Sequence, residues 1–121
     1  MFQAGDVLVH PTGARIRVES WDGRPDGILV YQLTLPGRGG RLPEHSHADQ
    51  TQEFQVLRGV ARYTLAGQEG VLAVGQSVVV PTGTVHVNPW NDTDAELVLR
   101  AVCRPAAGEA ETWIRLGFAR T

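Results

Sequence analysis

Turn-forming residues divide this chain into short segments, and this division constrains its fold more than any other feature of the sequence. The 121 residues include 14 glycines and 7 prolines, and most of these fall between short runs rich in β-branched residues. Strands that recur at such intervals, with no helical pattern between them, are typical of antiparallel sandwiches and barrels. We therefore predict an all-β chain with strands over residues 7–9, 15–20, 28–35, 52–58, 61–66, 70–73, 77–80, 86–88 and 95–102.

The C-terminal segment follows a different pattern. After Pro105, apolar residues recur at helical spacing, with acidic residues early and arginines late, as the helix dipole favours. This pattern predicts one short helix over about residues 107–120, with Trp113 and Phe118 packed on the sheets rather than stacked on a ligand. A length of 121 residues leaves room for one core, so residues 1–121 are predicted to form a single domain.

The polar composition excludes several classes of function. The single cysteine, Cys103, excludes a disulfide within the chain, and the absence of lysine excludes Schiff-base catalysis and lysine-dependent phosphate loops. The net charge is −2 and the arginines are scattered singly, so nucleic acid and membranes are not expected as partners. The first residues lack a basic segment followed by a long apolar stretch, so we expect a cytoplasmic protein.

Three of the four histidines lie in two short segments bounded by turns. In the first segment His45 and His47 stand one residue apart, and on an extended backbone both rings project to the same side. This spacing suits two ligands of one metal ion, although on its own it is also typical of polar loop histidines. The second segment leads from a valine-rich strand through a turn at Pro81 and Gly83 to His86.

Together, the two histidine segments and Gly59 resemble the paired motifs of the cupin superfamily, with the first motif at about residues 39–59 and the second at about 75–91. The resemblance implies a cupin-type double-stranded β-helix, a jelly-roll barrel that is often a homodimer and holds one divalent transition metal ion. Imidazole ligands with an oxygen ligand suit Fe, Ni, Zn, Mn or Cu, and the sequence does not choose among these metals. The histidine ligands that the resemblance implies are His45, His47 and His86.

The sequence departs from the family pattern at one ligand position, where Gln52 stands in place of the usual glutamate. Strand alternation puts Gln52 on one face and Glu53 on the other, so we expect Gln52 to face inward and offer its carbonyl oxygen to the metal. The alternative is a β-bulge at residues 51–52 that rotates Glu53 inward. A unit-charge pair at ~4 Å contributes ~4 kcal/mol at an effective dielectric constant of ~20, so the lost carboxylate predicts weaker or more selective metal binding. Gln52→Glu is expected to tighten it.

The same alternation identifies residues that could line a substrate pocket. For the strand at 28–35 either face could be the interior, because polar side chains on one face oppose Tyr31 and two leucines on the other. Each pocket candidate could instead fill the barrel, since small barrels pack their interiors. His10 is expected at the surface, and Cys103 is expected as a buried apolar residue. The pocket candidates are Gln32, Phe54, Asn88 and Trp90.

The sequence leaves three functions open. The first is a metal-dependent enzyme, dioxygenase-like or isomerase-like, that acts on a small organic molecule in the barrel. The chain has no obvious general base, which favours oxygen chemistry at the metal. The second is a non-catalytic module that binds a small molecule or senses a metal, which the loss of the glutamate ligand supports. The third is a scaffold for assembly, in which the helix that carries Trp113 caps a dimer partner.

Overall fold

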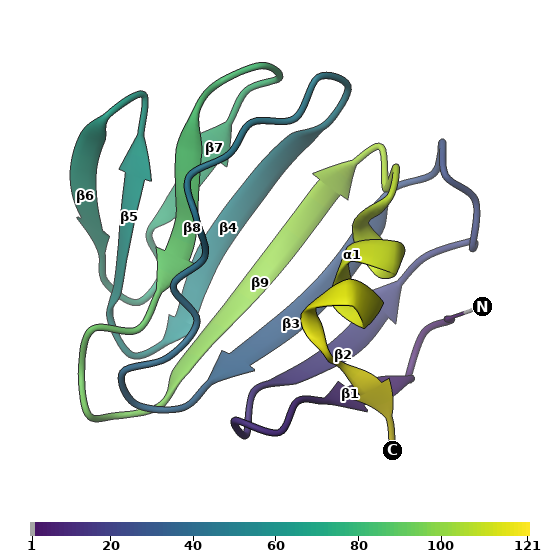
Figure 1. The fold of residues 1–121 in the computed structure, drawn as a ribbon, viewed down its shortest axis with the longest axis horizontal. Coiled ribbons are helices and arrows are strands. Elements are labelled where there is room, and N and C mark those ends of the chain that lie inside the picture. Colours follow the sequence, from purple (N-terminus) through teal and green to yellow (C-terminus); the bar gives the residue numbers. More distant parts are fainter. Residues whose placement is uncertain (1) are drawn as a thin grey trace.

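The computed structural model describes residues 2–121, so Met1 of the predicted domain lies outside the described residues. It consists of two β-sheets and, within the described residues, one helix, α1 (Figure 1). That helix is too short to cross a membrane, so no membrane-spanning helix is found in residues 2–121. The strands are β1 (Val7–Val9), β2 (Arg15–Ser20), β3 (Leu29–Leu35), β4 (Thr51–Arg58), β5 (Ala61–Leu65), β6 (Gln68–Leu72), β7 (Ser77–Val80), β8 (His86–Trp90), β9 (Leu97–Arg104) and β10 (Ala119–Arg120), and α1 is Glu109–Leu116.

All strand pairs are antiparallel. The larger sheet has the order β10-β1-β2-β3-β9-β4-β7, and the smaller sheet has the order β6-β5-β8. Strand β9, from late in the chain, therefore lies between β3 and β4, which the connection 36–50 joins. The prediction of an all-β jelly-roll barrel with a short C-terminal helix is confirmed.

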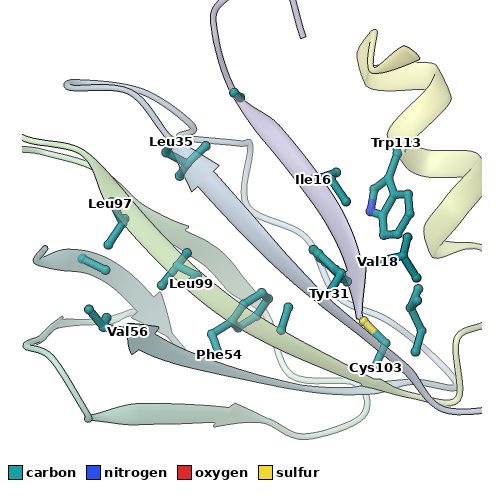
Figure 2. Packing of buried hydrophobic residues seen from close by; sticks show 14 of the residues in the cluster. Ile16, Val18, Tyr31, Leu35, Phe54, Val56, Leu97, Leu99, Cys103 and Trp113 are labelled. Carbon is teal, nitrogen blue, oxygen red and sulfur yellow. The ribbon is translucent and has the colours of Figure 1, made fainter. Parts of the chain in front are cut away.

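Alternating side chains of the two central strands build the core. In β4 every second residue is buried, from Gln52 through Phe54 to Val56, and β9 buries its own alternate residues from Leu97 to Cys103. Residues of the two strands face each other in register, so Phe54 pairs with Ala101 and Gln52 pairs with Cys103. Figure 2 shows Phe54 and Val56 of β4 and Leu97, Leu99 and Cys103 of β9 on one face of the larger sheet. Gln52 is thus a polar side chain among the apolar residues on the inward face of β4.

Helix α1 covers the end of the larger sheet that the small sheet leaves open (Figure 1). Its Trp113 ring, 2% exposed, packs edge-on against Tyr31 of β3 with ring centroids 4.8 Å apart. This confirms that Trp113 packs on the sheet.

The helix is shorter than predicted. It ends at Leu116 because Gly117 takes a left-handed conformation, with φ of 106°, and its N–H returns to the carbonyl oxygen of Ile114. Residues beyond it form β10, which pairs with β1 at Leu8 and Arg120. The prediction of helix up to residue 120 is therefore wrong in its last residues, and the helix begins two residues later than predicted.

Candidate metal centre

Three imidazoles from two separate segments meet at one point. His45 and His47 lie in the connection before β4, and His86 begins β8. One ring nitrogen of each lies within 4.8 Å of the corresponding nitrogens of the others, and the ring centroids are 4.4 to 5.4 Å apart. This is the convergence of the two histidine segments that the sequence predicted.

The backbone holds these segments together. The main-chain N–H of His45 donates to the carbonyl oxygen of His86 at 2.9 Å, and the N–H of His86 donates back at 2.8 Å. The N–H of Gly83 also donates to the carbonyl oxygen of His47 at 2.7 Å. Figure 1 shows the connection between β3 and β4 passing along β8. The two histidine segments are therefore paired as in a sheet.

A hydrogen bond at Nδ1 fixes the orientation of the His45 ring and of the His86 ring. The Nδ1 atom of His45 lies 2.8 Å from the carbonyl oxygen of Pro43, and that of His86 lies 2.9 Å from the carbonyl oxygen of Thr84. A carbonyl oxygen only accepts, so Nδ1 must carry the hydrogen and Nε2 keeps its lone pair. Carbonyl partners of this kind orient metal-binding histidines in proteins.

Four buried acceptor atoms in this region have no hydrogen-bond partner: Nε2 of His47, Nε2 of His86, Oε1 of Gln52 and Oδ1 of Asn88. Such an atom costs about 1–3 kcal/mol when it is left unpaired. A cation would interact favourably with these lone pairs, since the two amide oxygens and Nε2 of His86 carry no hydrogen and a neutral His47 ring can carry its hydrogen on Nδ1. Imidazole nitrogens together with an amide oxygen are a donor set for Fe, Ni, Cu, Zn or Mn. The residues present therefore fit a transition metal ion.

The environment keeps two of the rings neutral. Burial lowers the pKa of His47, and the neighbouring rings of His45 and His86 lower it further. Burial also lowers the pKa of His86, with a further contribution from His45. A neutral imidazole is the form that binds a metal. These two side chains are therefore ready to coordinate at neutral pH.

The structure decides between the two orientations of β4. Gln52 is 2% exposed and points inward, whereas the Glu53 side chain is 39% exposed and lies 3.8 Å from Arg104. Strand β4 pairs without interruption with β7 and β9 from residue 52 to residue 55, so there is no bulge at 51–52. Alternation correctly predicted that Gln52 faces inward, and the alternative of an inward Glu53 is wrong.

A buried carboxylate, Glu109, was missed by sequence reasoning. It begins α1, is 8% exposed, and accepts a hydrogen bond from the Tyr31 hydroxyl at 2.7 Å on Oε2. Its Oε1 accepts from Nε2 of Gln52 at 3.3 Å. Burial raises the pKa of this carboxyl group. The available signal was the spacing to Trp113, because residues four apart lie on the same face of a helix.

A cavity of about 630 Å³ extends from the histidines along the inner face of β2 and β3 to α1. Its polar lining includes His45, His47, Gln52, Asn88 and Glu109, and also His10, Arg41 and Arg115. Its other walls are mostly apolar or aromatic, and they include Ile16, Tyr31, Leu33, Leu35, Trp113 and Phe118. Figure 2 shows Ile16, Tyr31 and Trp113 close together at one end of the sheet. The cavity has room for a small organic molecule beside the imidazoles of His45 and His47.

Of the predicted pocket residues, Asn88 lines this cavity and the others do not. Gln32 lies on the opposite face of β3, where its amide donates to Glu19, so the inward face is that of Tyr31. Phe54 is buried in the core, and Trp90 is covered by the Arg41 guanidinium, 4.4 Å from its ring centroid.

His10 lies apart from the three clustered histidines. Its Nε2 atom lies 2.9 Å from the carbonyl oxygen of Leu116, and its ring packs against Phe118 with centroids 5.1 Å apart. His10 is partly buried and lines the far end of the cavity, so the expectation of a surface position holds only in part. It is not a member of the group that could hold a metal ion.

The chain is similar in sequence to known proteins. A family model described as "Cupin domain" matches residues 31–103. Quercetin 2,3-dioxygenase from Bacillus subtilis (strain 168) is 29% identical over 87 residues, which cover 71% of this chain and 26% of that protein. The chain therefore spans about a quarter of the length of this relative.

Solved structures share the fold. KdgF from Halomonas sp. matches with a TM-score of 0.68 and 20% identity, over 84% of this chain and 86% of that one. A protein described as a predicted oxalate decarboxylase from Thermotoga maritima matches with a TM-score of 0.70 and 15% identity, over 87% of this chain and 99% of that one. At such identities the matches establish a common architecture and nothing about activity.

Proposed function

Because this chain belongs to the cupin domain family, we propose that it binds one divalent transition metal ion and acts as a metal-dependent enzyme on a small organic molecule. One observation carries this proposal. Three imidazole nitrogens lie within 4.8 Å of one another, and two of them are buried without a hydrogen-bond partner.

The ligands of this ion would be Nε2 of His45, His47 and His86 together with Oε1 of Gln52. The hydrogen bonds of His45 and His86 to backbone carbonyls leave Nε2 as the donor atom on both rings. Gln52 uses its amide nitrogen toward Glu109, and its oxygen is left unpaired in the interior. Asn88, whose Oδ1 is also buried and unpaired, would lie beside the ion and bind substrate.

A metal held by these residues supplies Lewis-acid polarisation of a substrate oxygen or, for Fe, Cu or Mn, one-electron chemistry. The chain itself would bind the substrate through the apolar walls formed by β2, β3 and α1. Tyr31 holds its hydroxyl proton against Oε2 of Glu109. We favour a dioxygenase-like activity, since the curated relative is a dioxygenase and the cavity offers an apolar site next to the ligands.

A non-catalytic module that binds a small molecule or senses a metal is the second candidate. The observation that favours it is the uncharged Gln52 at the position where the family carries a glutamate. Three imidazoles and an amide are all neutral ligands, so none of them offsets the charge of the ion. Metal binding would therefore be weaker and more readily reversible than with a carboxylate ligand.

Metal analysis of protein purified without added metal, followed by oxygen uptake with a panel of diketones, flavonols and thiols, separates these candidates. An enzyme is expected to carry about one metal per chain and to consume at least one substrate of the panel. Stoichiometric metal with no substrate consumed would favour the binding module. Absence of metal and no binding of added Co²⁺ or Fe²⁺ would refute the enzyme and the metal sensor, and would favour a module that binds a small molecule without metal.

We also propose that the protein is a homodimer, as the resemblance to cupins implies, and that it is located in the cytoplasm. Size-exclusion chromatography with light scattering tests the oligomeric state. A mass of one chain at micromolar concentration would refute the dimer without affecting the proposed metal site.

A further inference from the structure

Glu109 is a buried carboxylate that the proposed function has not used. Burying a carboxylate is costly unless hydrogen bonds and opposite charge compensate it. Its hydrogen bonds come from Tyr31 and Gln52, and the Trp113 side chain also lowers its pKa; all three side chains are uncharged. No arginine in residues 2–121 forms an ion pair with it. His45, a member of the histidine cluster, lies close enough to Glu109 that a positive charge there would lower the pKa of the carboxyl group. A cation held by the histidine cluster would therefore favour the ionised form of Glu109.

Glu109 determines which way the Gln52 amide points. A carboxylate oxygen accepts and does not donate, so the NH₂ end of the amide must face it. This NH₂ group lies 3.3 Å from Oε1 of Glu109 and 3.8 Å from Sγ of Cys103. The carbonyl end, Oε1, then has no hydrogen-bond partner in the interior. That atom is the one assigned above to the metal.

The two residues together replace one charged ligand. Gln52 supplies the oxygen atom, and a bound cation would favour the ionised form of Glu109, whose negative charge then lies one hydrogen bond further from the ion. The carboxyl group also lies on the first turn of α1, where the positive end of the helix dipole favours a negative side chain. With the ion bound, the pair would restore the charge that strand β4 lacks.

We propose that Glu109 is the positioning residue of the metal centre, which orients Gln52 and balances the charge of the ion from helix α1. This inference rests on the proposed metal site. It assigns a metal-binding role to a residue outside both histidine segments, on the one helix found in residues 2–121.

A titration of the purified chain with Co²⁺, followed by calorimetry and visible absorption, tests this inference. Glu109→Gln keeps the size of the side chain and removes its charge. It is expected to weaken Co²⁺ binding about 10–100-fold, as loss of a partner that orients a ligand does in other metal sites. Glu111→Gln is the matched control, because Glu111 is an exposed carboxylate on the same turn of the same helix. It is expected to bind Co²⁺ like the wild-type chain.

A charge swap distinguishes positioning of the ligand from a merely structural role. The double variant Gln52→Glu/Glu109→Gln moves the carboxylate to the strand and keeps one amide and one carboxylate in contact. It is expected to recover wild-type affinity or better, with a changed Co²⁺ absorption spectrum. If Glu109 only held the helix in place, the swap would not restore binding, and the effects of the two substitutions would add.

Gln52→Glu alone tests the same claim without altering Glu109. With two carboxylates in contact, one must take up a proton, so this variant is expected to gain less affinity than the double variant. This changes the expectation from the sequence that Gln52→Glu simply tightens binding. It also keeps the inference testable if Glu109→Gln fails to fold.

The outcomes separate the inference from the function on which it rests. If the wild-type chain binds Co²⁺ and Glu109→Gln binds it as well as Glu111→Gln does, the role of Glu109 is refuted and the three-histidine site stands. If Gln52→Glu equals or exceeds the double variant in affinity, the role of Glu109 is also refuted. If the wild-type chain does not bind Co²⁺, both proposals fail.

Discussion

His86 offers the most direct separation of metal binding from folding. Its ring is fully buried, its Nδ1 lies 2.9 Å from the carbonyl oxygen of Thr84, and its Nε2 has no hydrogen-bond partner. His86→Leu replaces the ring with an apolar side chain of similar size. We expect this variant to lose metal-dependent stabilisation and to retain most of the stability of the metal-free chain.

The expected magnitudes follow from these contacts. Removing an unpaired buried nitrogen recovers about 1–3 kcal/mol, and losing the bond to Thr84 costs about 0.5–1.5 kcal/mol. The metal-free variant should therefore lie within about 2 kcal/mol of the metal-free wild-type chain. At a metal concentration 100 times Kd, binding adds about 2.7 kcal/mol to the wild-type chain, a rise in Tm of roughly 10 °C for a domain of this size.

Thermal unfolding with Co²⁺ and with a chelator measures both quantities. His10→Leu is the matched control, since His10 lies outside the cluster and is expected to keep the full Co²⁺-dependent rise in Tm. A rise of several degrees in His86→Leu would refute the assignment of His86 as a ligand. A loss of more than about 3 kcal/mol in the metal-free variant would refute the claim that the unpaired Nε2 of His86 destabilises the metal-free wild-type chain.

Three further predictions follow from the site. Because burial lowers the pKa of His47 and His86 below the ordinary 6.5, Co²⁺ affinity should fall between pH 7.5 and 6.5 by less than the roughly sixfold expected of three unperturbed histidines. Titrations at both pH values check this, and a sixfold loss or more would contradict it. Tyr31→Phe removes the buried hydrogen bond to Glu109 and should lower the free energy of unfolding in urea by about 1.5–3 kcal/mol. An unchanged midpoint of urea unfolding would show that this hydrogen bond does not stabilise the chain. Glu53→Gln should leave Co²⁺ affinity within twofold of the wild-type value in calorimetry, because its side chain points away from the site, and a larger loss would place Glu53 in the metal centre.

Turn chemistry predicted most strands well. The strands at 7–9, 15–20 and 77–80 have the predicted bounds, since turn residues flank each of them. Strand β6 begins two residues earlier than predicted, because Ala66 and Gly67 both take positive φ and form a two-residue hairpin turn. Strand β10 was not predicted, since two exposed residues after Gly117 carry no strand pattern of their own.

The site was predictable where local geometry determines it. Strand alternation placed Gln52 inside, and the one-residue spacing placed His45 and His47 together. Strand alternation could not identify the inner face of β3, because both faces carry residues that tolerate burial. In the structure Gln32 lies on the outer face, where its amide donates to Glu19, which in turn pairs with Arg100. Glu109 escaped sequence reasoning because acidic residues in a first helical turn normally face solvent.

The backbone bridge between His45 and His86 has a consequence for the proposed metal site. Main-chain atoms join the two histidine segments, and these bonds do not depend on which side chains the residues carry. Substitution of either ring should therefore leave the two segments paired, and exchange of one metal for another at the proposed site would require no refolding. Selection among metals would then depend on the chemistry of the donor atoms.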